Sequence, residues 1–451
     1  MNNIQRIAAI AGFLCLLFRP GIEAQQKPWT FQQCVDTAIR RNIALNQTRL
    51  ANETNKVNLQ QSKANQIPDL GASVNESGNF GKNINPTTNQ YVVQTYNSTN
   101  FGVSSSLNLF NGLQNSRTIK QNGVLVDAGN YDIESTKNQV ILNITSAYLQ
   151  VLFSYEILDA AKGQAEATQA QVDRTQKQVD AGLVPELNLY QIQAQLATDK
   201  LTVVNDQGQL DLAKVTLMQL MEVPVMDSFD IVKPEIIEPT ALISGSHEEL
   251  FQKALSVRPE IAGASLRTQS ALMGVQINKG GYWPKLNLGG NISTNFATSS
   301  ASSSEVNPNK DPFFTQLWDN IGAGLSLNLS IPIYSNRLYK SNVDRAKINA
   351  LNVQLSEENT KNQLRKNIEQ ASTDLKNAIN KYSATKDQLT SAEVSYKSIE
   401  KKFNVGLVTA IDYLVEKNNY NQAMSNMIQA KYDYVFKSKI LDFYIGKQIT
   451  F

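Results

Sequence analysis

The fold is decided by one stretch, IGAGLSLNLSI at residues 321–331, in which apolar residues alternate with glycine, serine and asparagine. A period of two places successive side chains on opposite faces of a β-strand. The run over residues 284–296 has the same pattern, with leucines facing one way and asparagines the other. In the first half of the chain, residues 101–109 and 70–74 repeat it. The sequence therefore predicts four strands, arranged as two hairpins, with one apolar and one polar face.

Strands of this kind, about 9 to 11 residues long and joined by long polar loops, are typical of outer-membrane β-barrels. The predicted loops, Asn75 to Asn97 and Thr298 to Pro312, are rich in Asn, Ser, Thr and Gly. A soluble sheet that covers a core shows the same alternation and is the alternative. Five aromatic residues near the loop ends would suit the girdle of a barrel: Tyr91, Tyr96, Phe313, Phe314 and Trp318.

Four strands are too few to form a barrel, since the smallest barrels have about eight. An open sheet edge cannot exist in lipid, because its backbone groups would have no hydrogen-bond partners there. If the strands lie in a membrane, several copies of the chain must contribute to one barrel.

The rest of the chain is predicted to form long helices. All 13 prolines lie outside two long segments of the sequence, one between Pro86 and Pro185 and one after Pro332. Since proline inside a helix costs about 3 kcal/mol, both segments can be helical. Each segment is interrupted once, at Gly182-Leu183-Val184 and at Gly406-Leu407-Val408. Glycine can adopt the left-handed conformation that ends a helix. The pattern predicts an antiparallel helical hairpin with a tight tip in each half.

The two halves are repeats of one large unit. At one constant offset Ala38 and Pro68 align with Ala254 and Pro284, and after a polar insertion the two Gly-Leu-Val tips align with each other. The period is far longer than the ~20 to 50 residues of solenoid repeats. We therefore expect a duplicated α+β unit, a β-hairpin followed by long antiparallel helices.

The N-terminus predicts export. Ile7 to Phe18 is an apolar core preceded by Arg6, and Ile22-Glu23-Ala24 offers a cleavage site. No later stretch approaches the ~18 apolar residues of a spanning helix. After cleavage Cys34 is the only cysteine, which excludes an intramolecular disulfide. A net charge of +2 with mixed signs argues against nucleic acid as a partner.

The predicted organisation follows from these features. A signal peptide spans residues 1–24. Repeat 1 spans 25–222, with a β-hairpin at about 68–110, helices at about 111–222 and a tip at 181–185. A linker spans 223–245, and its three prolines predict an equatorial segment beside the helices. Repeat 2 spans 246–451, with a β-hairpin at about 284–334, helices at about 336–446 and a tip at 404–409.

This pattern resembles the TolC family of trimeric outer-membrane efflux and secretion channels, over essentially the whole mature chain. The most specific match is Phe403-Asn404-Val405-Gly406-Leu407-Val408 followed by Ile411-Asp412, which is similar to the family's periplasmic tip. The resemblance implies a homotrimer with a twelve-stranded barrel in outer-membrane lipid and a large helical tunnel in the periplasm. It also implies a passive exit duct, engaged by an inner-membrane transporter through a periplasmic adaptor protein.

The resemblance places adaptor docking at the two tips, on Gly182, Leu183, Val184, Gly406, Leu407 and Val408. Small and apolar residues at an exposed turn offer a knob for another helical tip. The alternative is that these residues only form the turn and pack against neighbouring helices.

The resemblance also places a gate beside the second tip, at Asp412, Glu416, Phe403 and Val408. Asp412 matches one acidic ring position of the family, whereas the second ring position is Val415, with Glu416 next to it. Phe403 and Val408 replace a tyrosine and an arginine that link neighbouring helices, so closure here is expected to rest on apolar packing. Asp412 would form an acidic constriction, or else it only complements the helix dipole.

Two other classes of function were weighed. An enzyme finds little support, because the single histidine, His247, has no spaced partner for metal or nucleophile chemistry and no glycine-rich phosphate loop follows a strand. No cofactor or metal is expected. A soluble periplasmic coiled-coil scaffold or adaptor would share the signal and the helices, but it would not need strands that face lipid.

Overall fold

The computed structural model describes residues 27–84, 89–93, 96–234, 245–299 and 312–449. The predicted signal peptide lies outside the described residues, as do part of the linker and most of the second polar loop. The chain forms two compact units. Unit 1 combines residues 1–46, 136–257 and 365–451, and unit 2 combines residues 47–135 and 258–364. Two long helices, α4 (Gln114–Asp180) and α9 (Leu338–Asn404), contribute residues to both units.

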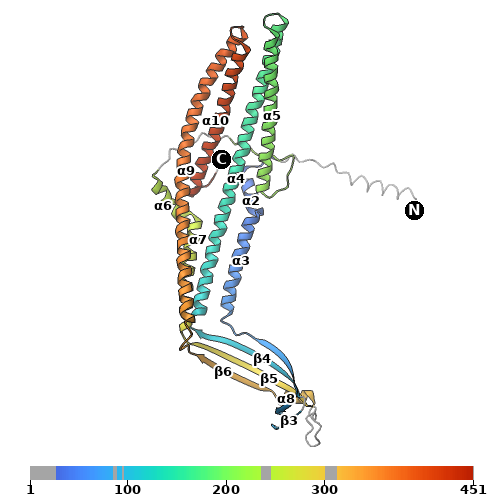
Figure 1. Ribbon diagram of the computed structural model, residues 1–451, viewed down its shortest axis with the longest axis vertical. Coiled ribbons are helices and arrows are strands. Elements are labelled where there is room, and N and C mark those ends of the chain that lie inside the picture. Colours follow the sequence, from blue (N-terminus) through green and yellow to red (C-terminus); the bar gives the residue numbers. More distant parts are fainter. Residues whose placement is uncertain (1–26, 85–88, 94–95, 235–244, 300–311, 450–451) are drawn as a thin grey trace, which may run out of the picture. The chain divides into compact units, whose positions relative to one another are not determined.

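Unit 2 contains a four-stranded antiparallel sheet (Figure 1), and the four predicted strands are confirmed. The strands lie in the order β1 (Gly71–Asn79), β4 (Tyr96–Asn111), β5 (Lys285–Ser299) and β6 (Gly322–Ser330). Strands β4 and β5, one from each repeat, pair along most of their length, so the two hairpins form a single sheet.

The register of the sheet separates its two faces. One apolar ladder crosses all four strands and consists of Ala72, Val103, Ile292 and Ala323. The adjacent ladder is polar and consists of Ser104, Asn291 and Gly324. On β6 the leucines of the apolar face are largely exposed, with Leu327 at 64 %. The described residues thus leave an apolar sheet face uncovered.

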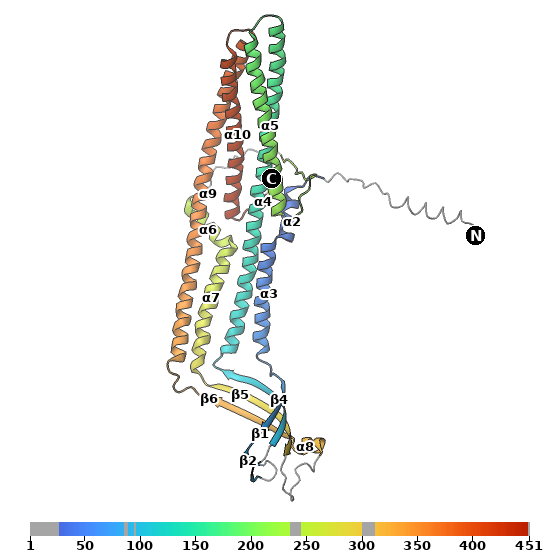
Figure 2. The ribbon, with the colours of Figure 1, turned by 45° about the vertical axis from the view of Figure 1, so that its right-hand side comes forward.

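The sheet is open. Among the described strands, β1 pairs only with β4 and β6 pairs only with β5, so each has one edge without a strand partner. Figure 2 shows the two edge strands on opposite sides of the sheet. Unpaired edges are templates for pairing with another chain.

The prediction that residues 75–97 form a loop was wrong. Strand β1 continues to Asn79, β4 begins at Tyr96, and a short ribbon of β2 (Lys82–Ile84) and β3 (Tyr91–Val93) lies between them. The added parts of β1 and β4, residues 75–79 and 97–100, contain no apolar side chain on either face, so they carry no period of two although the backbone ladder continues. In the second repeat β5 likewise runs to Ser299, beyond the predicted start of its loop.

A short helix, α8 (Phe313–Asp319), carries three of the five aromatic residues expected near the loop ends. The ring of Phe313 packs edge-on against Phe296 of β5, with ring centroids 4.9 Å apart, and against Phe101 of β4 at 6.2 Å. Trp318 is exposed. These rings therefore lie at the end of the sheet, as a girdle would require.

The helices of unit 2 pack through polar contacts and through one small apolar cluster, Val275, Val343 and Ala350. These helices are α3 (Ile43–Ala64), α7 (Pro259–Lys279) and the first parts of α4 and α9. The amide of Asn52 in α3 donates to Asn130 of α4 at 2.8 Å. A Cβ at neighbouring Gly129 would lie 2.1 Å from Asn52 Oδ1, so only glycine permits this close approach. A short 3₁₀ helix, Gly280–Tyr282, leads from α7 towards β5.

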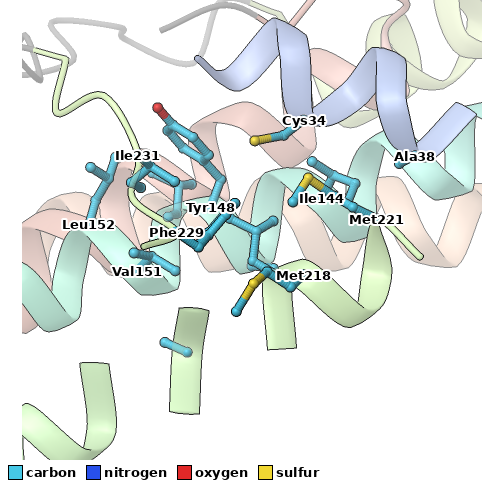
Figure 3. Packing of buried hydrophobic residues seen from close by; sticks show 14 of the residues in the cluster. Cys34, Ala38, Ile144, Tyr148, Val151, Leu152, Met218, Met221, Phe229 and Ile231 are labelled. Atoms are coloured by element: carbon cyan, nitrogen blue, oxygen red, sulfur yellow. The ribbon is translucent and has the colours of Figure 1, made fainter. Parts of the chain in front are cut away.

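Unit 1 contains the main apolar core (Figure 3). Its helices are α2 (Phe31–Arg41), α5 (Glu186–Leu220), α6 (His247–Val257), α10 (Ala410–Tyr444) and the remaining parts of α4 and α9. Tyr148 lies in this core and donates its hydroxyl to the carbonyl of Val232 at 2.6 Å. Cys34 is fully buried, and burial raises the pKa of its thiol to about 12. The free cysteine within the described residues is therefore a core residue with an unreactive thiol.

The apolar part of α4 explains a departure from the sequence prediction. By length and composition α4 could cross a membrane, although no such helix was expected after the signal peptide. Half of its apolar window is buried inside the chain, and Ile144, Val151 and Leu152 belong to the core of unit 1. The described contacts account for this stretch as a core helix.

Candidate functional site: the two helical tips

The first tip joins α4 to α5. The amide of Leu183 donates to the carbonyl of Gln178 and the amide of Gly182 donates to Val179, both at 2.8 Å. This pair of bonds is a Schellman motif, which satisfies the last carbonyls of a helix. It requires a left-handed residue, and Gly182 has φ +70°. The turn therefore follows from glycine at this position.

The second tip repeats this geometry between α9 and α10. The amides of Leu407 and Gly406 donate to Lys402 and Phe403, at 2.9 and 3.0 Å, and Gly406 has φ +77°. The leucine that follows each glycine, Leu183 or Leu407, is 74 % exposed. The two tips thus present the same apolar side chain at the same place in the same turn.

The tips differ in how the next helix begins. Helix α5 starts after Pro185, which makes no side-chain cap. Helix α10 starts after Thr409, whose hydroxyl accepts from the amide of Asp412 while the Asp412 carboxylate accepts from the amide of Thr409. This is a capping box, which favours a carboxylate at the third helical position. The capping box is therefore specific to the second repeat, because Glu186 in the first turn of α5 follows a proline without a side-chain cap.

Asp412 caps the first turn of α10. Hydrogen bonds from the hydroxyl and amide of Thr409 lower the pKa of its carboxyl group below the usual value of 3.8. The side chain is exposed and ionised at neutral pH. The cap leaves the carboxylate at the surface, one turn from the exposed Leu407.

The other three predicted gate residues divide into two groups. Glu416 lies one helical turn after Asp412 and accepts from the hydroxyl of Ser395 in α9 at 2.9 Å. Phe403 is buried and stacks on Tyr413 with ring centroids 4.9 Å apart. Val408 packs against the same cluster. Two candidates are thus carboxylates at the surface, and two hold the hairpins together.

An apolar group below the turns, which we call the tip cluster, joins the two hairpins. Its buried members are Val172, Leu189, Ile192, Leu196, Phe403, Ala410 and Tyr413. They come from α4, α5, α9 and α10, that is, from both repeats. The side-chain amide of Gln178 adds a hydrogen bond to the carbonyl of Asn404 at 3.1 Å. The packing is apolar where the family resemblance led us to expect altered polar links.

A buried ion pair next to the tip cluster was not predicted from the sequence. Lys417 Nζ of α10 lies 2.7 Å from Asp199 Oδ2 of α5 and also donates to the hydroxyl of Thr168 in α4. Burial lowers the pKa of Lys417, and the Asp199 carboxylate opposes that change. A sequence signal exists: each charge continues the three-and-four spacing of a buried seam, after Tyr413 on α10 and after Leu196 on α5.

Among the described residues, no group of three or more His, Cys, Asp or Glu side chains is placed to hold a metal ion. The site consists of two exposed leucines, a capped carboxylate and the packing beneath them.

Comparison with known proteins supplies the context for this geometry. The sequence profile of the family described as outer membrane efflux protein matches residues 34–222 and 250–447. Outer membrane protein TolC of Salmonella enteritidis is 23% identical over 326 residues, which are 71% of this chain and 64% of that protein. Toxin and drug export protein A of Aggregatibacter actinomycetemcomitans is 21% identical over 311 residues, or 67% of this chain and 63% of that protein.

A solved structure has the same fold. The crystal structure of the Campylobacter jejuni CmeC outer membrane channel superimposes with a TM-score of 0.74 at 19% sequence identity. The match covers 92% of this chain and 85% of the channel. The alignments with the two sequence relatives span less than two thirds of those proteins.

Proposed function

Because the chain belongs to the outer membrane efflux protein family, we propose that it forms the outer-membrane exit duct of a tripartite efflux or type I secretion system. Such a duct conducts passively, and the energy and the choice of cargo come from an inner-membrane transporter. The proposed location is the outer membrane, with the helices in the periplasm. No catalytic step is part of this function.

The observation that carries the proposal is the sheet. It has one apolar face left uncovered, one polar face, and an edge without a strand partner on β1 and on β6. Lipid would cover the apolar face and water would wet the polar one. The edges must be paired before the sheet can enter lipid. Pairing of β6 in one copy with β1 in the next satisfies both edges, and three copies give the twelve strands of the family's barrel.

The tips are the proposed docking site for a periplasmic adaptor. Leu183 and Leu407 are exposed on rigid turns, so they can enter an apolar recess on a partner without first becoming ordered. Gly182 and Gly406 keep the turns narrow, and Val184 and Val408 lie half-buried beside them. In three copies the six tips would form a ring of apolar contacts.

Asp412 is the proposed constriction. Its carboxylate is held by the capping box, so copies related by a threefold axis would place three negative charges at equal depth. Such a ring favours cations and repels anions. Glu416, one turn further along α10, would add a second set of charges.

Export and membrane insertion test the proposal together. Deletion of the gene should raise intracellular accumulation of a dye exported by the partner pump, and the intact gene should restore export. A Leu407→Asp variant should insert normally and fail to export, while Leu201→Asp, on the exposed side of α5 away from the tip, serves as the matched control. Recovery of the wild-type protein in the soluble periplasm without detergent would favour the alternative, a coiled-coil scaffold or adaptor.

A further inference from the structure

Three residues, which we call the anchor, tie the two repeats together below the tips: Lys417, Asp199 and Thr168. The ammonium of Lys417 contacts the carboxylate of Asp199 and the hydroxyl of Thr168, and that hydroxyl also donates to Asp199. The second oxygen of Asp199 accepts from Gln195 at 2.8 Å. Every charge in the group is therefore compensated and hydrogen-bonded.

Breaking the anchor carries a large free-energy cost. The Lys417 side chain is 0 % exposed and that of Asp199 is 7 % exposed. Separating them would leave a buried charge without its partner, which is strongly unfavourable, whereas a buried pair adds little stability over apolar residues of the same size. Buried polar groups of this kind are best known for fixing one register between packed helices. The anchor is therefore suited to hold the packed helices in one register, and not to switch between two arrangements.

The anchor occurs once in the duplicated chain. At the constant offset between the two tips, Lys417 corresponds to Gln193, Asp199 to Ala423 and Thr168 to Ala392. None of these counterparts carries a charge. A group of residues that each repeat needs for its own fold would occur in both repeats. The anchor occurs in one place, where α10 of the second repeat contacts α4 and α5 of the first, so we assign it to that contact.

The surroundings of the anchor change along the helices. On the side toward the turns, α4, α5 and α10 contribute Val172, Leu196 and Tyr413 to the dry tip cluster. On the other side the same helices line a cleft of about 340 Å³ with Gln164, Thr202 and Asn418. Lys417 is seven residues from the start of α10, or about two turns and roughly 10 Å from the tip. The anchor therefore lies between the apolar tip cluster and a polar cleft, and Asp199 is part of the wall of that cleft.

We propose that Lys417, through Asp199 and Thr168, is a positioning residue that ties the two hairpins of one protomer together two turns below their tips. Opening of the duct then moves only the segments between the anchor and the turns, while the apolar tip cluster rearranges. The anchor holds α10 in register, and with it the Asp412 carboxylate at the depth of the constriction. This inference rests on the proposed channel function.

The test is single-channel recording in planar bilayers with an apolar replacement of the pair. Lys417→Met combined with Asp199→Leu removes both charges at similar volume, so the trimer should assemble with an unchanged melting temperature. The register is lost, and spontaneous opening of the closed channel should become about tenfold more frequent. A stable trimer with wild-type opening would overturn the proposal, because a purely structural ion pair would give that result.

A second ion pair of α10, formed with α4, provides the control. Lys431 of α10 lies 3.1 Å from Glu156 of α4, but both side chains are partly exposed. Lys431→Met with Glu156→Leu should leave the opening frequency unchanged. An equal rise in both double variants would show that any loss of charge loosens the helices, and the anchor would have no special role.

A milder variant covers the case in which the double replacement fails to assemble. Thr168→Val removes one hydroxyl at nearly constant volume, and it should raise the opening frequency by a few fold. No change in this variant would also count against the anchor. If wild-type protein shows no conductance at all, the proposed channel function fails first, and that outcome is distinct from a conducting channel whose gating ignores the anchor.

Discussion

The apolar face of the sheet predicts a strong effect of a single charge. Leu327 lies near the middle of β6, on the face that also carries Leu288 of β5, directly across the ladder. It is 64 % exposed within the chain, so its replacement removes little internal packing. We consider Leu327→Arg, with Asn328→Arg as the matched control on the opposite face of the same strand.

The magnitude follows from the lipid environment. Arginine on the lipid face near the bilayer midplane costs about 2–4 kcal/mol. With three copies in one barrel, the penalty for the assembled duct is about 6–12 kcal/mol. A folded protein has only about 5–15 kcal/mol of stability, so a penalty of about 2–4 kcal/mol in every copy should strongly reduce the assembled fraction. Asn328 is exposed on the polar face, where an arginine would remain in water and cost little.

The assay measures how much protein reaches the outer membrane as an oligomer that resists cold detergent. Leu327→Arg should lose most of this species and accumulate as a urea-extractable fraction, whereas Asn328→Arg should match the wild type. Equal behaviour of the two variants would refute the assignment of the apolar face to lipid. If Asn328→Arg reduced the amount of oligomer more than Leu327→Arg did, the opposite face of the sheet would be the one in contact with lipid.

Four further outcomes follow from the tips and the helices below them. Asp412→Ala should lower the preference of the open channel for cations. In the wild type, Thr409 makes the pKa of the Asp412 carboxyl group lower in the folded protein than in the unfolded one. The stabilisation by the cap is therefore complete above the pKa of the unfolded state and is lost as the pH falls through the pKa of the folded state, so the start of α10 should fray only in strong acid. Gly406→Ala should lower the melting temperature of the oligomer by an amount equivalent to about 1–2 kcal/mol per copy, since the position has φ +77° and open space around it, and Gly406→Asn should cost less; an unchanged melting temperature would contradict the turn geometry. Leu407→Asp should abolish adaptor cross-linking at the tip without changing membrane insertion, and retained cross-linking would remove that leucine from the docking site. Lys417→Met alone should destabilise by about 3–5 kcal/mol in a thermal melt, because it leaves Asp199 buried without its partner, and a wild-type melt would contradict the buried pair.

The sequence predicted those parts of the fold that depend on local pattern. The alternation around Leu325 and Leu327 predicts a strand with one apolar and one polar face, and the structure has the strand β6 at these positions. The glycines at both tips are needed wherever a helix ends in a left-handed residue, and both are observed there. Such features are fixed by a few neighbouring residues, so periodicity and turn chemistry are sufficient to find them.

The remaining features depend on contacts between distant segments. The polar extension of β1 to Asn79 has no apolar period, and only its pairing with β4 reveals it as a strand. The buried pair of Lys417 was not predicted from the sequence, because only the packed helices bring Asp199 and Thr168 within its reach. Charges at the seam positions of both helices were the available clue, and their pairing required the packed hairpins.

The central claim is that the open edges of the sheet are closed by other copies of the same chain. Paired cysteines, one on β1 and one on β6 of the same chain, test it directly, since the native Cys34 is buried and unreactive. After oxidation of the membrane-embedded protein, a non-reducing gel should show monomer, dimer and trimer and no larger species. This result is expected for at least one choice of the two cysteine positions along β1 and β6. Protein that stays monomeric in every register and dissolves in buffer without detergent would contradict the claim.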